Sequence, residues 1–130
     1  MTQDVLKITK LTFGIHFIIG FIFTILFFIP DITIPMFGLA LSFDTHALSL
    51  TIGSLFAGFT ASSLFGIFAR EWKQVKIVVI SELVWLVSNL ITGVVSFSVF
   101  DLLIAVFILI LTIALILLFA LVLLKQEDIF

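Results

Sequence analysis

One stretch, residues 76–97, limits the possible folds more than any other part of the chain. It reads KIVVISELVWLVSNLITGVVSF and is long and apolar enough to cross a lipid bilayer. Five of its polar or amphipathic side chains are spaced by three, four, three and four residues: Glu82, Trp85, Asn89, Thr92 and Ser96. This spacing places them along one side of a helix. The stretch therefore predicts a membrane-spanning helix with one polar side.

The composition indicates that lipid is the solvent for most of the chain. Of the 130 residues, 63% are hydrophobic and only 11% are charged. A water-soluble domain of this length could not bury so much apolar surface. The net charge of -2 implies no particular partner, and six Lys and Arg residues are too few for a nucleic-acid surface. We therefore expect the lipid bilayer, and no nucleic acid, as a partner.

The chain contains four apolar runs of spanning length, at residues 11–29, 47–69, 76–97 and 102–124. The shortest would extend about 28 Å as a helix, which is close to the hydrocarbon thickness. We expect the first run to be a retained helix and not a signal peptide, since it lacks a small-residue cleavage site. The sequence thus predicts an all-α fold, a single membrane domain over 1–130 that forms an antiparallel four-helix bundle.

The segment at residues 34–43 is apolar but too short to span the membrane. It is expected either to lie along the outer interface as a short helix, with Pro35 near its start, or to form an ordered loop over the bundle. The sequence does not separate these two alternatives.

The charges predict the orientation of the bundle. With four spans, all six cationic residues fall on one side: Lys7, Lys10, Arg70, Lys73, Lys76 and Lys125. The loops on the opposite side hold only Asp31, Asp44, Asp101 and His46. The positive-inside rule then predicts that both termini are cytoplasmic, and we expect the plasma membrane as the location.

Small residues predict how the helices pack, because close approach and interhelical hydrogen bonds hold helices together in lipid. The second span carries two rows of them at steps of four: Gly53, Ala57 and Ala61, and Ser54, Gly58, Ser62 and Gly66. The first span has Gly20 at the same spacing between His16 and Thr24. We expect the second span to form the central packing surface, so that Gly58→Leu would disrupt assembly. The fourth span, polar only at Thr112, is expected to be the most lipid-exposed.

Helix register predicts a layer of polar residues in the cytoplasmic half of the membrane. His16 lies six residues beyond Lys10, and Glu82 six beyond Lys76, which places each about 9 Å in from its basic flank. Ser62 and Ser63, on the returning second span, reach a similar level. We expect Glu82, His16 and one of these serines to meet.

A second polar layer is expected further out, made by Asn89, Thr24 and Ser54. Trp85, one turn from Glu82, is interpreted as a packing aromatic, with a ligand-stacking role as the alternative. Glu82 itself has three possible roles: a neutral acid in a structural hydrogen bond, a structural pair with His16, or a site for a proton, a cation or a ligand. A charge in mid-membrane costs about 2.5–3.5 kcal/mol on insertion scales, so Glu82 requires one of these arrangements.

The motifs of common enzyme classes are absent: the sequence has no Gly-rich phosphate loop, HExxH or GxSxG, and it has no Cys. We expect no metal, no cofactor and no enzymatic activity. The favoured function is a bundle that binds a partner protein in the membrane, a second copy of itself or a lipid. The alternative is a carrier or ligand-binding unit that uses Glu82 and His16 for a proton, a cation or a small polar molecule.

Overall fold

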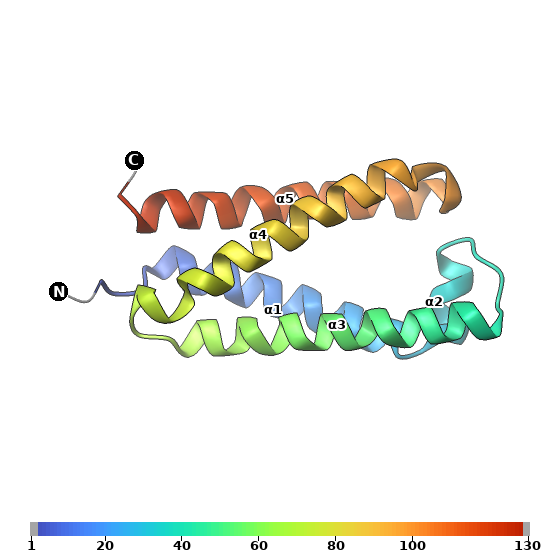
Figure 1. Ribbon diagram of the computed structural model, residues 1–130, viewed down its shortest axis with the longest axis horizontal. Coiled ribbons are helices and arrows are strands. Elements are labelled where there is room, and N and C mark those ends of the chain that lie inside the picture. The colour runs from blue at the N-terminus through green and yellow to red at the C-terminus, as the bar shows by residue number, and fades with distance from the viewer. Residues whose placement is uncertain (1–2, 129–130) are drawn as a thin grey trace.

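The computed structural model describes residues 3–128, and these residues form helices joined by short links. The long helices are α1 (Lys7–Phe27), α3 (Phe43–Phe68), α4 (Trp72–Val95) and α5 (Leu102–Gln126). Two short ones are α2 (Pro30–Met36) and the 3-10 helix η1 (Phe97–Val99). All four long helices are long and apolar enough to cross a membrane, as the sequence predicts. In Figure 1, α1 and α4 run away from the end of the molecule where α1 begins, and α3 and α5 run back towards it.

Three long helices, α1, α3 and α4, begin in the segments that flank their apolar runs, whereas α5 begins at the first residue of its run. Ser42 caps α3, because its side chain accepts a hydrogen bond from the backbone N–H of Thr45 and the Thr45 hydroxyl accepts one in return. Asp101 caps α5 by accepting from the backbone of Leu103 and Ile104. α1 and α3 consequently start four residues earlier than their apolar runs.

The segment between α1 and α3 forms a short helix, but over residues 30–36 and not 34–43, so that Pro35 lies near its end and not near its start. Pro30 occupies the first turn of α2, where its fixed backbone angle is favourable and its missing N–H is not needed. Gly38 then turns the chain with a φ of 77°. The backbone N–H of Asp101 donates to the carbonyl of Phe37 at 3.0 Å, which ties this segment to the start of α5.

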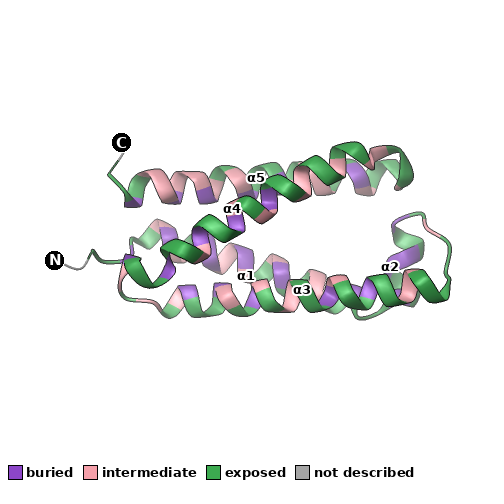
Figure 2. Cartoon of the chain, viewed as in Figure 1, coloured by how far each residue is buried: buried purple, intermediate pink, exposed green. Residues whose placement is uncertain are grey.

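The four long helices form two pairs. α1 packs along α3 and α4 packs along α5, whereas α3 and α4 have few contacts. Figure 1 shows why: α4 starts beside the end of α3 and crosses obliquely towards α5. In Figure 2 the buried residues of each helix follow a narrow stripe, and the rest of its surface is exposed. The two pairs therefore diverge towards the end that carries α2.

Small residues allow α1 and α3 to approach closely, but they are only partly the predicted ones. Gly20 lies against Thr60, Gly53 against Phe27, and Gly66 against Phe13. By contrast, the structure places Ser54, Gly58 and Ala61 on the exposed side of α3, and Ala57 and Ser62 are half-buried. A Cβ atom at Gly58 would meet nothing within 4 Å. The expectation that both rows form the central packing surface is therefore corrected: α3 packs through the side that carries Gly53, Thr60, Ser63 and Gly66.

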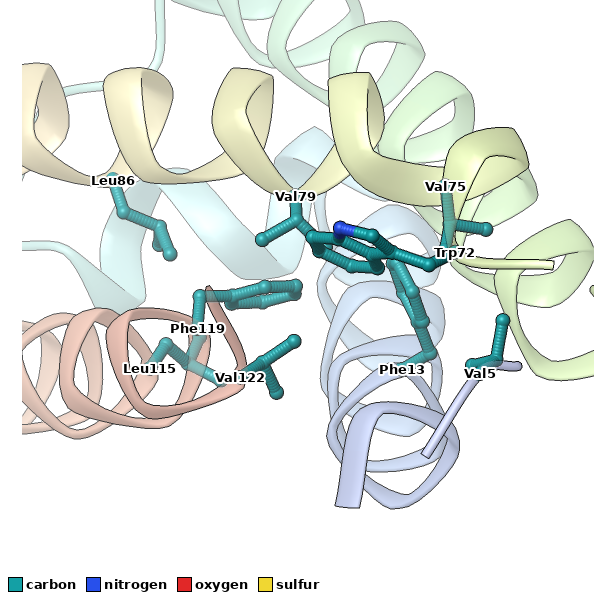
Figure 3. Close-up of a cluster of buried hydrophobic side chains, with 9 residues drawn as sticks. All are labelled: Val5, Phe13, Trp72, Val75, Val79, Leu86, Leu115, Phe119 and Val122. Atoms are coloured by element: carbon teal, nitrogen blue, oxygen red, sulfur yellow. The ribbon is translucent and has the colours of Figure 1, made fainter. Parts of the chain in front are cut away.

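A cluster of buried apolar side chains fills the end of the molecule where α1 begins (Figure 3): Val5, Phe13, Trp72, Val75, Val79, Leu86, Leu115, Phe119 and Val122. α5 contributes three of them, and its Phe119 and Val122 are 0% exposed. The expectation that the fourth span is the most lipid-exposed is therefore corrected. In an almost wholly apolar helix, the side that packs inward has the same composition as the side that faces outward. The sequence of α5 therefore could not reveal this packing.

A polar clasp closes the same end of the molecule around the fully buried side chain of Gln126. Gln126 Oε1 accepts hydrogen bonds from the backbone N–H of Leu6 at 3.1 Å and from the Thr9 hydroxyl at 2.9 Å. Its Nε2 donates to the carbonyl of Asp4 at 2.8 Å, and Gln3 donates to its backbone carbonyl. The last turn of α5 is thereby joined to the segment that precedes α1.

Glu127 extends this clasp to α4 and gives it a pH dependence. The hydrogen bond from the Trp72 indole lowers the pKa of Glu127 most, followed by the hydrogen bond and the charge of Lys76, whose ammonium is 3.0 Å away. A lowered pKa means that the stabilisation is complete above the ordinary glutamate pKa of about 4.3 and is lost as pH falls through the folded value. We expect the melting temperature to fall in this acidic range, and to fall less in Glu127→Gln. A thermal melt against pH in detergent measures both. Equal acid sensitivity of the two proteins would contradict this role.

Candidate functional site

Three buried polar side chains from three helices meet in the interior. His16 of α1 lies with its Nδ1 2.6 Å from Ser63 Oγ of α3 and with its Nε2 3.5 Å from Glu82 Oε2 of α4. All three are at most 3% exposed. The structure thus brings together the residues that helix register places in one layer. Ser63 is the serine that takes part, because Ser62 donates to the carbonyl of Gly58 on its own helix.

The surroundings of this cluster are aromatic and apolar. The ring of Phe119 on α5 meets the His16 ring edge to face, with 5.3 Å between the ring centres. Phe13 packs on the other side of Phe119 at 5.8 Å. These contacts fix the orientation of the imidazole, so that one ring nitrogen faces Ser63 and the other faces Glu82.

The Glu82 carboxyl group is buried without a hydrogen-bond partner at either oxygen. The Nε2 atom of His16 lies 3.5 Å from Glu82 Oε2, which is slightly too long for a hydrogen bond. A buried polar group without a partner costs about 1–3 kcal/mol, and a charged group costs more. Glu82 is therefore held at the expense of fold stability.

The second predicted polar layer does not assemble. Thr24 donates to the carbonyl of Gly20, and Ser54 to that of Leu50, so each hydroxyl is satisfied within its own helix. Asn89 instead donates to the Thr112 hydroxyl of α5 at 3.3 Å. Sequence reasoning overlooked Thr112 as a partner because the apolar fourth span was assigned to the lipid. Its one polar residue was the available signal.

A cavity of about 330 Å³ lies between the two helix pairs. Its walls come from α1, α3, α4 and α5, with Phe37 and Phe100 at the end that carries α2. The only polar side chains among its lining residues are His16, Trp85, Asn89, Thr92 and Thr112. The remainder of the lining is phenylalanine, leucine, isoleucine and small residues. The cavity is therefore predominantly apolar, with a few polar groups along the α4–α5 side and at His16.

Aromatic rings form one wall of this cavity. Phe56 stacks on Phe23 and Phe27 at 5.4 and 5.6 Å between ring centres, and it meets Trp85 edge to face at 5.5 Å. Phe59 supports Trp85 from behind at 4.8 Å. Trp85 consequently packs against α3 and also presents a surface to the cavity, so both roles considered for it are compatible with its position.

One end of the cavity is closed by apolar contacts, and its side is open. Leu86 and Leu115 belong to both the lining and the buried cluster of Figure 3, so the cavity stops at that cluster. At the far end Phe37 meets Phe100 edge to face at 5.8 Å. Two lining residues, Leu55 of α3 and Thr92 of α4, are exposed on the surface where these helices diverge. Access from the side of the molecule, between α3 and α4, is therefore the most direct.

Among residues 3–128, no three His, Cys, Asp or Glu side chains come together in a way that could hold a metal ion. Comparison of the chain with protein-family models, with curated proteins and with solved structures finds no match.

Proposed function

We propose that this protein is a non-enzymatic, multi-pass protein of the plasma membrane that binds the apolar chain of a lipid-like molecule between its helix pairs. Its four long helices form an antiparallel bundle with both termini in the cytoplasm. The positions of the charges support this orientation. The cationic residues flank α1, the α3–α4 link and the end of α5, whereas the opposite loops hold acidic residues and His46.

The cavity is the observation that carries the proposed function. Its volume of about 330 Å³ falls in the range of small-molecule sites, and its lining matches the chemistry of a hydrocarbon chain. Access beside Leu55 and Thr92 favours a ligand that arrives through the bilayer and not through water. Asn89 and Thr112 provide hydrogen-bonding groups for an oxygen atom on such a chain.

The test uses Trp85 as a reporter inside the cavity. In a Trp72→Phe background, Trp85 is the only tryptophan, since the chain has two. We expect a brominated fatty acid added to the detergent-purified protein to quench Trp85 emission in a saturable way. The unbrominated fatty acid should restore the emission.

Two alanines of α5 provide a blocked protein and its matched control. Ala105 is buried and lines the cavity, so Ala105→Phe places a ring in the space that the ligand needs. Ala114 is exposed and does not line it, so Ala114→Phe adds the same ring elsewhere. We expect at least a tenfold weaker affinity for Ala105→Phe only, a difference of about 1.4 kcal/mol. Equal saturable quenching in both variants would refute binding at this site.

A further inference from the structure

The His16–Glu82 contact joins the only ionisable groups within the membrane-spanning parts of their helices. Between its flanking charges α1 contributes only His16, and α4 contributes only Glu82. The spanning parts of α3 and α5 contribute no ionisable group and face the pair with Ser63 and Phe119. The protonation of this pair is therefore governed by its own two members.

The charge of the buried pair fixes how many protons it holds. An isolated charge is costly in lipid, so the pair is most stable when it is neutral overall. Neutrality requires one proton beyond those of an imidazole and a carboxylate. That proton sits either on Glu82, as a carboxylic acid, or on His16, as an imidazolium. The 3.5 Å between His16 Nε2 and Glu82 Oε2 allows a small side-chain movement to pass it from one to the other.

Ser63 occupies one of the two imidazole nitrogens. Nδ1 of His16 is hydrogen-bonded to Ser63 Oγ at 2.6 Å, which leaves the other nitrogen for Glu82. Nε2 then gains and loses the proton, and it is the nitrogen that faces Glu82. The serine thus helps to hold the imidazole in the orientation that proton exchange with Glu82 requires.

Fold stability does not account for Glu82. Both of its carboxyl oxygens lack hydrogen-bond partners, so an apolar side chain of similar length would fit the site without that penalty. We expect Glu82→Met to melt no lower than the wild type. An ionisable residue buried within a spanning helix at a cost to stability points to a role for its ionisation.

The two sides of the His16–Glu82 pair differ in how easily a proton can reach them. Towards the end where α1 begins lie Phe13, Val79, Phe119 and Val122, which are each 0% exposed and packed together in Figure 3. On the other side His16 itself lines the cavity. A proton leaving the pair therefore has a route into the cavity and no comparable route to the end that carries the clasp.

We propose that His16, Ser63 and Glu82 form a proton-binding site that exchanges its proton through the cavity, with the side of the membrane that faces α2. In its neutral state the site holds one proton. This proton moves between the carboxyl group of Glu82 and Nε2 of His16. This goes beyond lipid binding, and it is tested without any lipid-like ligand, so its failure leaves the ligand test unaffected.

The experiment follows Trp85, one turn from Glu82 on α4, in the Trp72→Phe protein reconstituted in vesicles. Protease digestion of the exposed chain ends first establishes the orientation. A pH jump is then applied to one side at a time. We expect Trp85 emission to change at least tenfold faster when the jump is on the side of α2. Equal rates, or a faster response from the side of the clasp, would overturn the route.

Variants of the pair decide whether it is the group that titrates. Glu82→Gln keeps the shape and should abolish the emission change, together with the infrared C=O band of a protonated carboxyl. Glu82→Met should have the same effect and provides the test if Glu82→Gln does not fold. His16→Gln should remove the fast response, because the proton no longer has its relay. A titration that persists in both Glu82 variants would overturn the site.

Discussion

Gly66→Leu is expected to destabilise the protein by more than about 3 kcal/mol, at the upper end of overpacking effects. A Cβ atom at Gly66 would lie 2.6–2.7 Å from three ring carbons of Phe13. Phe13 cannot move aside, because it is 0% exposed and its ring packs edge to face on Phe119. The clash therefore separates α1 from α3 at the level of the buried cluster. Thermal unfolding of the purified protein in detergent measures the loss.

Gly58→Leu is the matched control on the same helix. A Cβ at Gly58 meets nothing within 4 Å, and its position is exposed. Glycine is a poor helix former, so this substitution should leave the melting temperature unchanged or raise it slightly. If Gly58→Leu were as damaging as Gly66→Leu, the packing of α3 described here would be incorrect.

Gln126→Leu is expected to be the second most damaging substitution, because it removes the side-chain hydrogen bonds of the clasp. Leu6 N–H, the Thr9 hydroxyl and the Asp4 carbonyl each lose the side-chain partner that Gln126 provides. Thr9 is buried, and a buried polar group left unpaired costs about 1–3 kcal/mol, whereas the bonds of the exposed Leu6 and Asp4 contribute about 0.5–1.5 kcal/mol each, so a total of about 3 kcal/mol is expected. The leucine keeps the side-chain volume, which separates the loss of hydrogen bonds from the loss of packing.

Lys125→Ala tests the neighbouring position on the last turn of α5. Lys125 is exposed, and its removal should change stability by less than about 0.5 kcal/mol. Amide hydrogen exchange of Leu6, whose N–H donates to Gln126, adds a local measurement. We expect faster exchange there in Gln126→Leu only. Protection that remained in that variant would show that the clasp does not depend on Gln126.

The helical fold and its four apolar spans could be predicted from the sequence, because the length and apolar character of each run determine them. The packing of α5 could not be predicted from the sequence. Its inner side is distinguished by shape alone, as Leu115, Phe119 and Val122 differ little in chemistry from the residues that face outward. The exposure of Gly58 was equally hidden, since two rows of small residues on one helix looked alike.

The candidate site was predictable where it depends on register and not where it depends on helix crossing. The meeting of His16, Ser63 and Glu82 could be predicted because the sequence gives the number of residues between each of them and its charged flank. Thr24 and Ser54 failed to join a polar layer because serine and threonine hydroxyls bond readily to their own helix one turn back. The cavity follows from the oblique path of α4, which no residue pattern encodes (Figure 1).

The clasp also has a consequence for the order in which the chain matures during synthesis. Asp4 and Leu6 emerge early, but the Gln126 side chain that satisfies their backbone groups is made 122 and 120 residues later. Until then, the Leu6 N–H and the Asp4 carbonyl can bond only to water, although Val5 can already donate to the Arg70 carbonyl. Complete docking of this segment therefore requires the last helix to be in place. A protease site introduced beside Asp4 should become resistant to cleavage only after α5 is complete.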